Sequence, residues 1–140
     1  MKPRLNIVTL GVKNLKNSVS FYSNLFSRKP GKGSDDNIAF FNHDGIIVSL
    51  YPFEKLAADA GLPAEKSRFP GITLSINCST KEDVDVLYRR AVVHSAGELV
   101  KPHETFWGGY GAYFSDPDGY AWEIAWAPFW EFDEQGSLKL

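Results

Sequence analysis

The chain has 140 residues, of which 44% are hydrophobic and 23% are charged, and its net charge is −2 at pH 7. This composition is typical of one globular domain with a substantial core, and it excludes a disordered or fibrous protein. The chain lacks the excess of basic residues that attracts a protein to nucleic acids or anionic membranes. No apolar stretch approaches the roughly 20 residues of a membrane span. We therefore expect no nucleic-acid partner and no membrane partner.

Cysteine usage and the first residues indicate the compartment. The single cysteine, Cys78, excludes an internal disulfide bond and a cysteine-rich zinc site. Residues 1–6 are partly basic but lack the apolar segment of a signal peptide. Both observations favour a cytoplasmic protein.

The first half of the chain predicts a strand, a helix and a hairpin. Residues 5–10 alternate and are rich in β-branched side chains, which indicates a strand, and Asn14 is a suitable N-cap for the helix that follows. Residues 30–37 are a loop or a weak strand. Strands at 38–41 and 46–51 then flank an Asn-His-Asp-Gly turn.

The same order of elements recurs after a connector at 52–70, in which we expect one short helix at 54–60. The second set comprises a strand at 72–77, a helix capped by Ser79 or Thr80, a short strand at 98–101, a loop at 103–109 and strands at 111–115 and 120–126. This recurrence predicts two β-α-β-β-β units that pack together as one α+β domain. The tail at 127–140 is aromatic and then polar, and it could cover an edge strand or take part in a dimer contact.

The last hairpin turns at Asp116-Pro-Asp-Gly119, a sequence that favours a type I turn followed by a glycine bulge. That register pairs Tyr113 with Glu123. Alternation then sends Trp122, Ile124 and Trp126 toward the helices, and Ala121, Glu123 and Ala125 to the other face. Small residues beside Glu123 predict a concave surface with Tyr113 as the hydrogen-bond donor to the carboxylate. The alternative is a Glu123 that is merely exposed on a half-solvated sheet.

Aromatic residues crowd the segment before this hairpin, namely Phe106, Trp107, Tyr110 and Tyr113. They either complete ordinary packing or form a flat apolar lining for a planar ligand. His103 begins the loop that borders the predicted cavity, where it is either exposed or functional. His43, at a turn tip, is predicted to be solvated.

Two segments resemble the vicinal oxygen chelate superfamily, which comprises glyoxalases, bleomycin-resistance proteins and extradiol dioxygenases. The first is Thr9-Leu-Gly-Val-Lys-Asn-Leu15 running into Ser18-Val-Ser-Phe-Tyr22, and the second is Trp107-Gly-Gly-Tyr110 with Phe114-Ser-Asp-Pro-Asp-Gly-Tyr-Ala-Trp-Glu123. The resemblance implies two tandem βαβββ modules that form a cupped eight-stranded mixed sheet with the helices outside, commonly in a homodimer. The single domain at 1–140 would comprise module one at about 1–51, the connector at 52–70, module two at 71–126 and the tail at 127–140.

Enzymes of this superfamily bind a divalent metal through four side chains. The resemblance maps those positions onto Ile7, Val48 or Ser49, one residue within 71–73, and Glu123. Only Glu123 is a usual metal ligand, whereas a catalytic metal needs about three nitrogen, oxygen or sulfur ligands. We therefore expect neither a metal nor another cofactor.

These observations predict a glyoxalase/bleomycin-resistance-like protein that binds a small aromatic or amphipathic molecule without a metal. Glu123 and Tyr113 would be its polar anchors. The other lining residues would be Phe106, Trp107, Tyr110, Ile7 and Thr9. The alternatives are a lyase or isomerase with Glu123 as acid/base and His103 assisting, a metalloenzyme such as a dioxygenase whose ligands are not recognised, and a partner-binding role of the tail.

Overall fold

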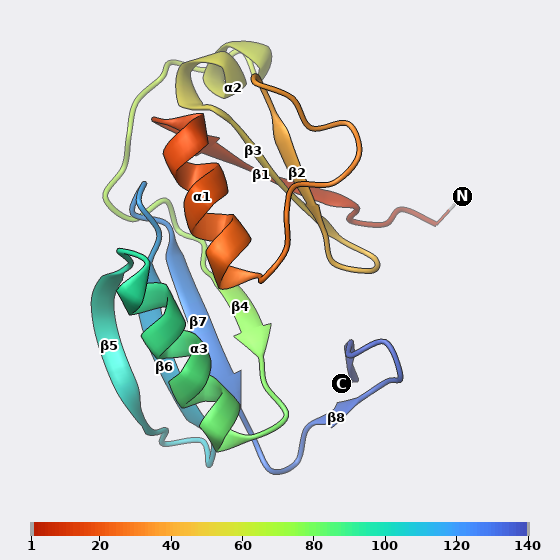
Figure 1. The fold of residues 1–140 in the computed structure, drawn as a ribbon, viewed down its shortest axis with the longest axis vertical. Coiled ribbons are helices and arrows are strands. Elements are labelled where there is room, and N and C mark those ends of the chain that lie inside the picture. Colours follow the sequence, from red (N-terminus) through yellow and green to blue (C-terminus); the bar gives the residue numbers. More distant parts are fainter. Residues whose placement is uncertain (1, 140) are drawn as a thin grey trace. The chain divides into compact units, whose positions relative to one another are not determined.

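The computed structural model describes residues 2–139, and the chain divides after Ser67 into two compact units. Each unit has a sheet with one helix laid across it (Figure 1). Within residues 2–139, no helix is both long enough and apolar enough to cross a membrane.

The first unit contains three strands and two helices in the order β1 (Ile7–Val12), α1 (Leu15–Leu25), β2 (Ala39–Asn42), β3 (Ile47–Pro52) and α2 (Phe53–Asp59). The strand order in its sheet is β1-β3-β2, with β1 parallel and β2 antiparallel to β3. Turns connect α1 to β2, so the loop is the correct alternative for residues 30–37. The first module therefore has one strand fewer than a full βαβββ unit.

The core of the first unit lies between α1 and its sheet. Apolar side chains of both elements are buried there, among them Phe21, Tyr22, Leu25, Leu10, Val12, Phe41 and Leu50. Asn14 is the N-cap of α1, as predicted, because its side chain accepts a hydrogen bond of 3.0 Å from the Asn17 backbone N–H. His43 is not freely solvated. Its ring centroid lies 4.4 Å from that of Phe26.

The opposite side of this sheet carries hydroxyl side chains. Ser49 pairs with Thr9 in the parallel register, and its Oγ donates a 3.2 Å hydrogen bond to Thr9 Oγ1. Because neighbouring strand residues point to opposite faces, Val48 belongs to the helix side. Ser49, not Val48, therefore shares a face with Ile7 and Thr9.

The second unit has the full βαβββ order that the sequence predicted. Its elements are β4 (Leu74–Asn77), α3 (Lys81–Val93), β5 (Gly97–Glu104), β6 (Tyr110–Ser115) and β7 (Ala121–Trp126), with the strand order β4-β7-β6-β5. Thr80 caps α3 by accepting a 3.1 Å hydrogen bond from the Asp83 N–H. β5 continues to Glu104, three residues beyond its predicted end, and is interrupted by register shifts.

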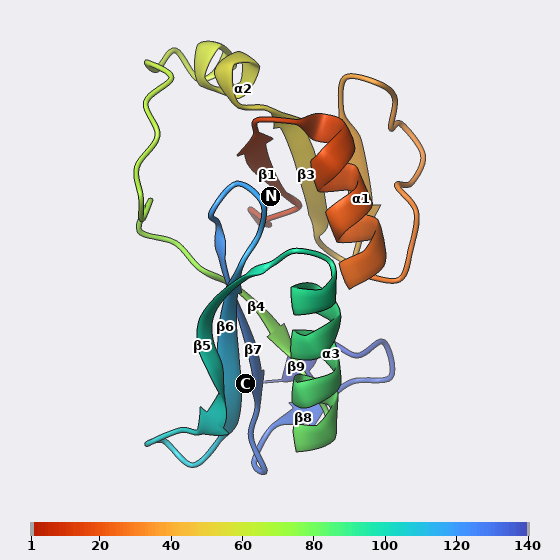
Figure 2. The same cartoon turned by 60° about the vertical axis from the view of Figure 1, so that its left-hand side comes forward.

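α3 lies across one face of this sheet, where the core of the second unit forms (Figure 2). Phe114 and Trp122 stack at a centroid distance of 6.3 Å with an interplanar angle of 4°. Val84 and Tyr88 of α3 are buried as well. Trp122 therefore faces the helix, as the alternation predicted.

The hairpin between β6 and β7 is closed by its predicted turn. The buried Asp116 carboxylate accepts hydrogen bonds of 2.9 Å from the Asp118 N–H and 2.8 Å from the Tyr120 N–H. Gly119 has φ +88°, a conformation that glycine adopts without strain. This turn sets the register in which Tyr113 pairs with Glu123, so the predicted pairing is confirmed.

The tail forms a small hairpin of β8 (Glu131–Phe132) and β9 (Leu138–Lys139). Among the described residues it does not extend the four-stranded sheet. The α+β class with mixed sheets is confirmed. The expectation of one cupped eight-stranded sheet stays a prediction, since the two sheets hold three and four strands.

Candidate functional site

Three polar side chains form a row on the face of the second sheet that α3 does not cover. In the strand register Ser75 of β4 lies opposite Glu123 of β7, which lies opposite Tyr113 of β6. Ser75 Oγ donates a 3.1 Å hydrogen bond to Glu123 Oε1, and the Tyr113 hydroxyl donates to Glu123 Oε2. Both carboxylate oxygens therefore have a hydroxyl donor, and the predicted contact between Tyr113 and Glu123 is confirmed.

Glu123 changes the acidity of Tyr113. The hydrogen bond to the carboxylate, together with partial burial and the negative charge, raises the pKa of Tyr113 to about 12. The phenol is therefore neutral at physiological pH and remains a hydrogen-bond donor.

Small residues next to this row leave space above the sheet. Gly111 and Ala125 lie opposite each other in the register, and a cavity of about 190 Å³ opens over them. Its lining consists of His103, Thr105, Phe106, Trp107, Gly111, Tyr113, Glu123 and Ala125. The concave surface predicted around Glu123 is thus present within the second unit.

A tight turn forms the aromatic rim of this cavity. The Thr105 N–H donates to the Gly109 carbonyl, and the Gly109 N–H donates to Thr105 Oγ1, each at 2.9 Å. Trp107 folds back over Gly109, since a Cβ built there would lie 2.1 Å from the indole ring. The ring centroid of Trp107 also lies 5.6 Å from that of Trp130 in the tail, whereas the Phe106 side chain is fully exposed. Trp107 is thus held in place from both sides, and Phe106 is free to contact a ligand.

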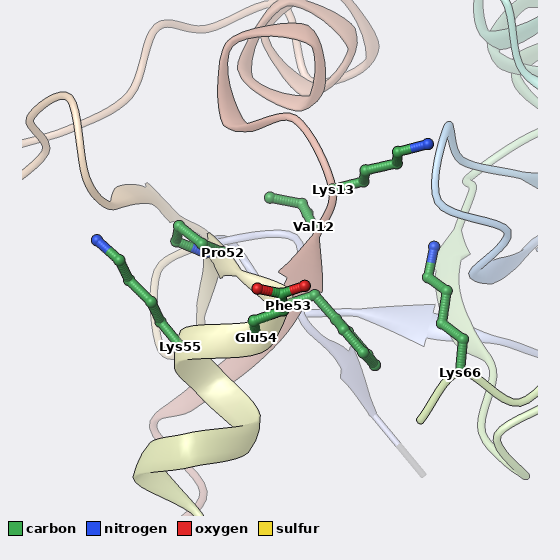
Figure 3. A pocket seen from close by; sticks show the side chains of 7 residues that line it. All are labelled: Val12, Lys13, Pro52, Phe53, Glu54, Lys55 and Lys66. Atoms are coloured by element: carbon green, nitrogen blue, oxygen red, sulfur yellow. The ribbon is translucent and has the colours of Figure 1, made fainter. Parts of the chain in front are cut away.

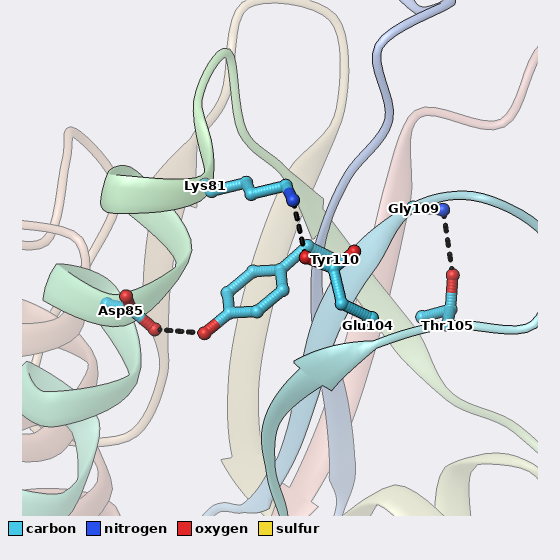
Figure 4. A network of polar contacts seen from close by, with 6 residues as sticks. All are labelled: Lys81, Asp85, Glu104, Thr105, Gly109 and Tyr110. Atoms are coloured by element: carbon cyan, nitrogen blue, oxygen red, sulfur yellow. Dashed lines mark hydrogen bonds and ion pairs between the residues drawn. The ribbon is translucent and has the colours of Figure 1, made fainter.

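Tyr110 does not line this cavity, contrary to its predicted role as a stacking surface there. Its hydroxyl donates a 2.9 Å hydrogen bond to Asp85 Oδ1 of α3 (Figure 4). Lys81 Nζ lies 5.6 Å from the Tyr110 ring centroid and forms an ion pair with Glu104. The physical reason is strand alternation, which places residue 110 on the face opposite residue 113.

His103 lies within β5 and not at the start of a loop. It is opposite Gly111 in the register, and its Nδ1 is 3.0 Å from the Lys101 carbonyl oxygen. Its exposed ring lines the same cavity as Glu123. The structure therefore brings the two predicted catalytic residues to one cavity, while their catalytic roles stay predictions.

Ile7 and Thr9 belong to the first unit. Ile7 is 46% exposed, and Thr9 accepts the hydrogen bond from Ser49. Their contact with a ligand of the cavity around Glu123 therefore stays a prediction.

Ser75 is the residue of this site that the sequence analysis missed. The third family metal position was placed within residues 71–73, but β4 begins at Leu74, and Ser75 is the neighbour of Glu123. The available signal was the alternation of Leu74 and Ile76 with Ser75 and Asn77, which marks Ser75 as a residue of the free face.

The residues at the family's metal positions do not fit a divalent metal ion. They are Ile7, Ser49, the 71–73 segment with its neighbour Ser75, and Glu123, and Glu123 already accepts two hydroxyl hydrogen bonds. Throughout the described part of the chain, no three His, Cys, Asp or Glu side chains come together in a way that could hold a metal. One carboxylate is fewer than the roughly three protein ligands of a catalytic metal site.

Comparison with known proteins gives the family. Residues 4–124 match the model of the Glyoxalase/Bleomycin resistance protein/Dioxygenase superfamily. A glyoxalase-related enzyme from Fulvimarina pelagi is 28% identical and has a TM-score of 0.89, with 99% of each chain covered. A search of curated proteins finds no match.

Two further solved structures share the fold at lower identity. A glyoxalase/bleomycin resistance protein/dioxygenase family enzyme from Burkholderia phytofirmans PsJN is 20% identical with a TM-score of 0.81, and the match covers 89% of this chain and 99% of that one. The hypothetical protein SA1046 from S. aureus is 20% identical with a TM-score of 0.79, and the match covers 91% and 95%. The sequence motifs, the βαβββ order and the family match agree, and the chain belongs to the glyoxalase, bleomycin-resistance protein and dioxygenase superfamily.

Proposed function

We propose that the protein binds a small aromatic or amphipathic molecule, without a metal, in the cavity of the second unit. The observation that carries this proposal is the Glu123 carboxylate, which Tyr113 and Ser75 hold in place at the wall of a concave surface with an aromatic rim. A few fixed polar groups within a largely apolar lining are typical of small-molecule sites.

The chemistry of the cavity indicates which ligand groups it favours. Glu123 is an acceptor, so a ligand amine, amide N–H or hydroxyl can donate to it, and a charged donor forms the stronger hydrogen bond. The exposed ring of Phe106 and the ring of Tyr113 offer flat apolar surfaces to a planar group or a cation. At about 190 Å³ the cavity is smaller than the roughly 300 Å³ at which drug-sized sites begin. A compact ligand, or one part of a larger molecule, therefore fits it.

The test is a titration with benzylamine, phenol and benzoate in which binding is measured by calorimetry and by thermal unfolding. We expect benzylamine to bind best and Glu123→Gln to weaken its binding about tenfold, because the charge-assisted hydrogen bond is lost. Glu98→Gln is the matched control, since Glu98 also accepts a hydrogen bond from a tyrosine, Tyr88, at 2.9 Å, and does not line the cavity. Equal losses in both variants, or no stabilising compound, would contradict the proposal.

A second candidate is a lyase or isomerase, because His103 and Glu123 line the same cavity. Glu123 would then transfer a proton as general acid/base, and His103 would assist. Turnover that survives Glu123→Gln rules this candidate out. A metalloenzyme such as a dioxygenase, with ligands outside the family positions, is tested by metal analysis of protein purified without added metal.

The proposal also includes the family arrangement implied by the sequence, in which both modules line one cupped cavity and the protein is a cytoplasmic homodimer. Light scattering on the purified chain tests the dimer. NMR that detects contact between a bound ligand and Ile7 or Thr9 tests the contribution of the first module.

A further inference from the structure

The first unit has a cavity of its own, which shares no lining residue with the cavity around Glu123. It measures about 620 Å³ and is bordered by the ends of β1 and β3, the start of α2 and the chain near residue 66 (Figure 3). Its lining consists of Val12, Lys13, Pro52, Phe53, Glu54, Lys55 and Lys66. All of these residues belong to the first unit.

The strand topology explains why a hollow forms here. β1 and β3 are parallel, and their last residues, Val12 and Pro52, lie opposite each other. The chain leaves both ends toward different helices, and crevices outside the carboxyl ends of parallel strands are where ligands bind in open α/β sheets. The cavity lies at the edge of the sheet where these two strands end.

The apolar wall of the cavity depends on close packing of α2. A Cβ at Gly11 would lie 2.9 Å from Phe53 Cδ2 and 3.1 Å from Phe53 Cα, so only glycine allows this approach. Phe53 is half-buried and lines the cavity together with Val12 and Pro52. Of these, Phe53 and Pro52 are half-buried and offer a surface for an apolar or aromatic body, whereas Val12 is buried beneath it.

The rim of the cavity is positively charged. Among the residues that line it, Lys13, Lys55 and Lys66 carry ammonium groups and Glu54 carries a carboxylate. Lys66 Nζ lies 5.9 Å from the Phe53 ring centroid, a cation–π arrangement that keeps an ammonium group beside the apolar wall. This basic rim contrasts with the net charge of −2 of the whole chain.

We propose that this cavity is a second binding site, for a small organic anion with an aromatic or apolar body. Phe53 and Pro52 contact the body, and the ammonium groups of the rim hold a carboxylate or a phosphate ester. This site prefers anions. In the cavity of the second unit, by contrast, the carboxylate of Glu123 favours hydrogen-bond donors and cations. The two sites are therefore distinguishable by the charge of their ligands.

The test is an NMR titration of the full-length chain with phenyl phosphate, inorganic phosphate and benzyl alcohol. We expect phenyl phosphate to give saturable shifts at the signals of residues 12, 13, 53 and 66, and to bind at least about threefold more tightly than either other probe. Benzoate distinguishes a carboxylate from a phosphate preference. Shifts that do not saturate, or that spread evenly over all lysines, would overturn the proposal.

Variants separate this site from general charge effects. The double substitution Lys13→Met and Lys66→Met should weaken phenyl phosphate binding at least about threefold, because exposed ion pairs are individually weak. Lys29→Met with Lys32→Met is the matched control, since it removes two exposed lysines of the same unit that do not line the cavity.

Two single variants complete the test. Glu54→Gln should strengthen binding by removing the opposing charge, and Glu123→Gln should leave it unchanged. Equal losses in the two double variants, or loss on Glu123→Gln, would contradict a separate site. Failure of the ligand site in the second unit would leave these results unaffected.

Discussion

The two units share one structural plan but differ on the sheet face that the helix leaves free. Each has a parallel strand pair, β1 with β3 and β4 with β7, and a helix whose apolar side chains face the sheet. On the free face, the first unit pairs Thr9 with Ser49, whereas the second has Ser75, Glu123 and Tyr113 in a row. The face that packs against the helix therefore builds a core in each unit, and the two units differ in the polar side chains of the opposite face.

The largest loss of stability should come from substitutions in the cores of the two units. Phe41 and Phe114 are both 0% exposed, and replacing either with alanine should lower the free energy of unfolding by about 3–5 kcal/mol. Denaturant titration measures both losses. If Phe114→Ala cost far less than Phe41→Ala, the two units would not be built on equivalent cores.

The helix caps should give the next largest effect. The side chains of Asn14 and Thr80 each accept one backbone hydrogen bond at the start of a helix, so Asn14→Ala and Thr80→Ala should each cost about 1 kcal/mol. Chemical unfolding of the two variants measures the losses. The neighbour Ser79→Ala serves as the control and should cost little, and a cost equal to that of Thr80→Ala would contradict the assignment of the cap.

The contact between Glu123 and Tyr113 in the second unit should be measurable as a change in the pKa of the tyrosine. Glu123→Gln removes the carboxylate that raises the pKa of Tyr113 to about 12, so this pKa should fall toward 10. The pKa of Tyr88, which burial and then the Glu98 carboxylate raise to about 12, should stay unchanged. Alkaline titration followed by tyrosinate absorbance measures the change, and an unchanged curve would mean that Glu123 and Tyr113 are not in contact in solution.

The smallest effect concerns His43 of the first unit. Burial and the nearby Arg28 charge lower the pKa of His43, although Asp44 partly opposes them, and its buried Nε2 has no hydrogen-bond partner among the described residues. The unfolded state then takes up a proton near pH 6.5 that the folded state resists, so stability should fall as the pH drops below that value.

His43→Phe keeps the ring contact with Phe26 but cannot be protonated. Its free energy of unfolding, compared between pH 8 and pH 5.5, should fall by less than that of the wild type. The same decrease in both proteins would show that His43 does not titrate in this way.

Local sequence signals determined much of this protein. The helix caps and the Asp116-Pro-Asp-Gly119 turn each depend on a few consecutive residues. The turn alone fixes the register that pairs Tyr113 with Glu123. These features were predictable because neighbouring residues in the chain make the contacts that define them.

Tertiary structure decided the rest. Ser75 meets Glu123 through the pairing of β4 with β7, two strands 48 residues apart in the chain at this contact. Tyr110 binds Asp85 because α3 covers its face of the sheet, and the lysine-rimmed cavity exists because two parallel strands end together. Such contacts join segments that are distant in sequence, so packing, and not local pattern, decides them.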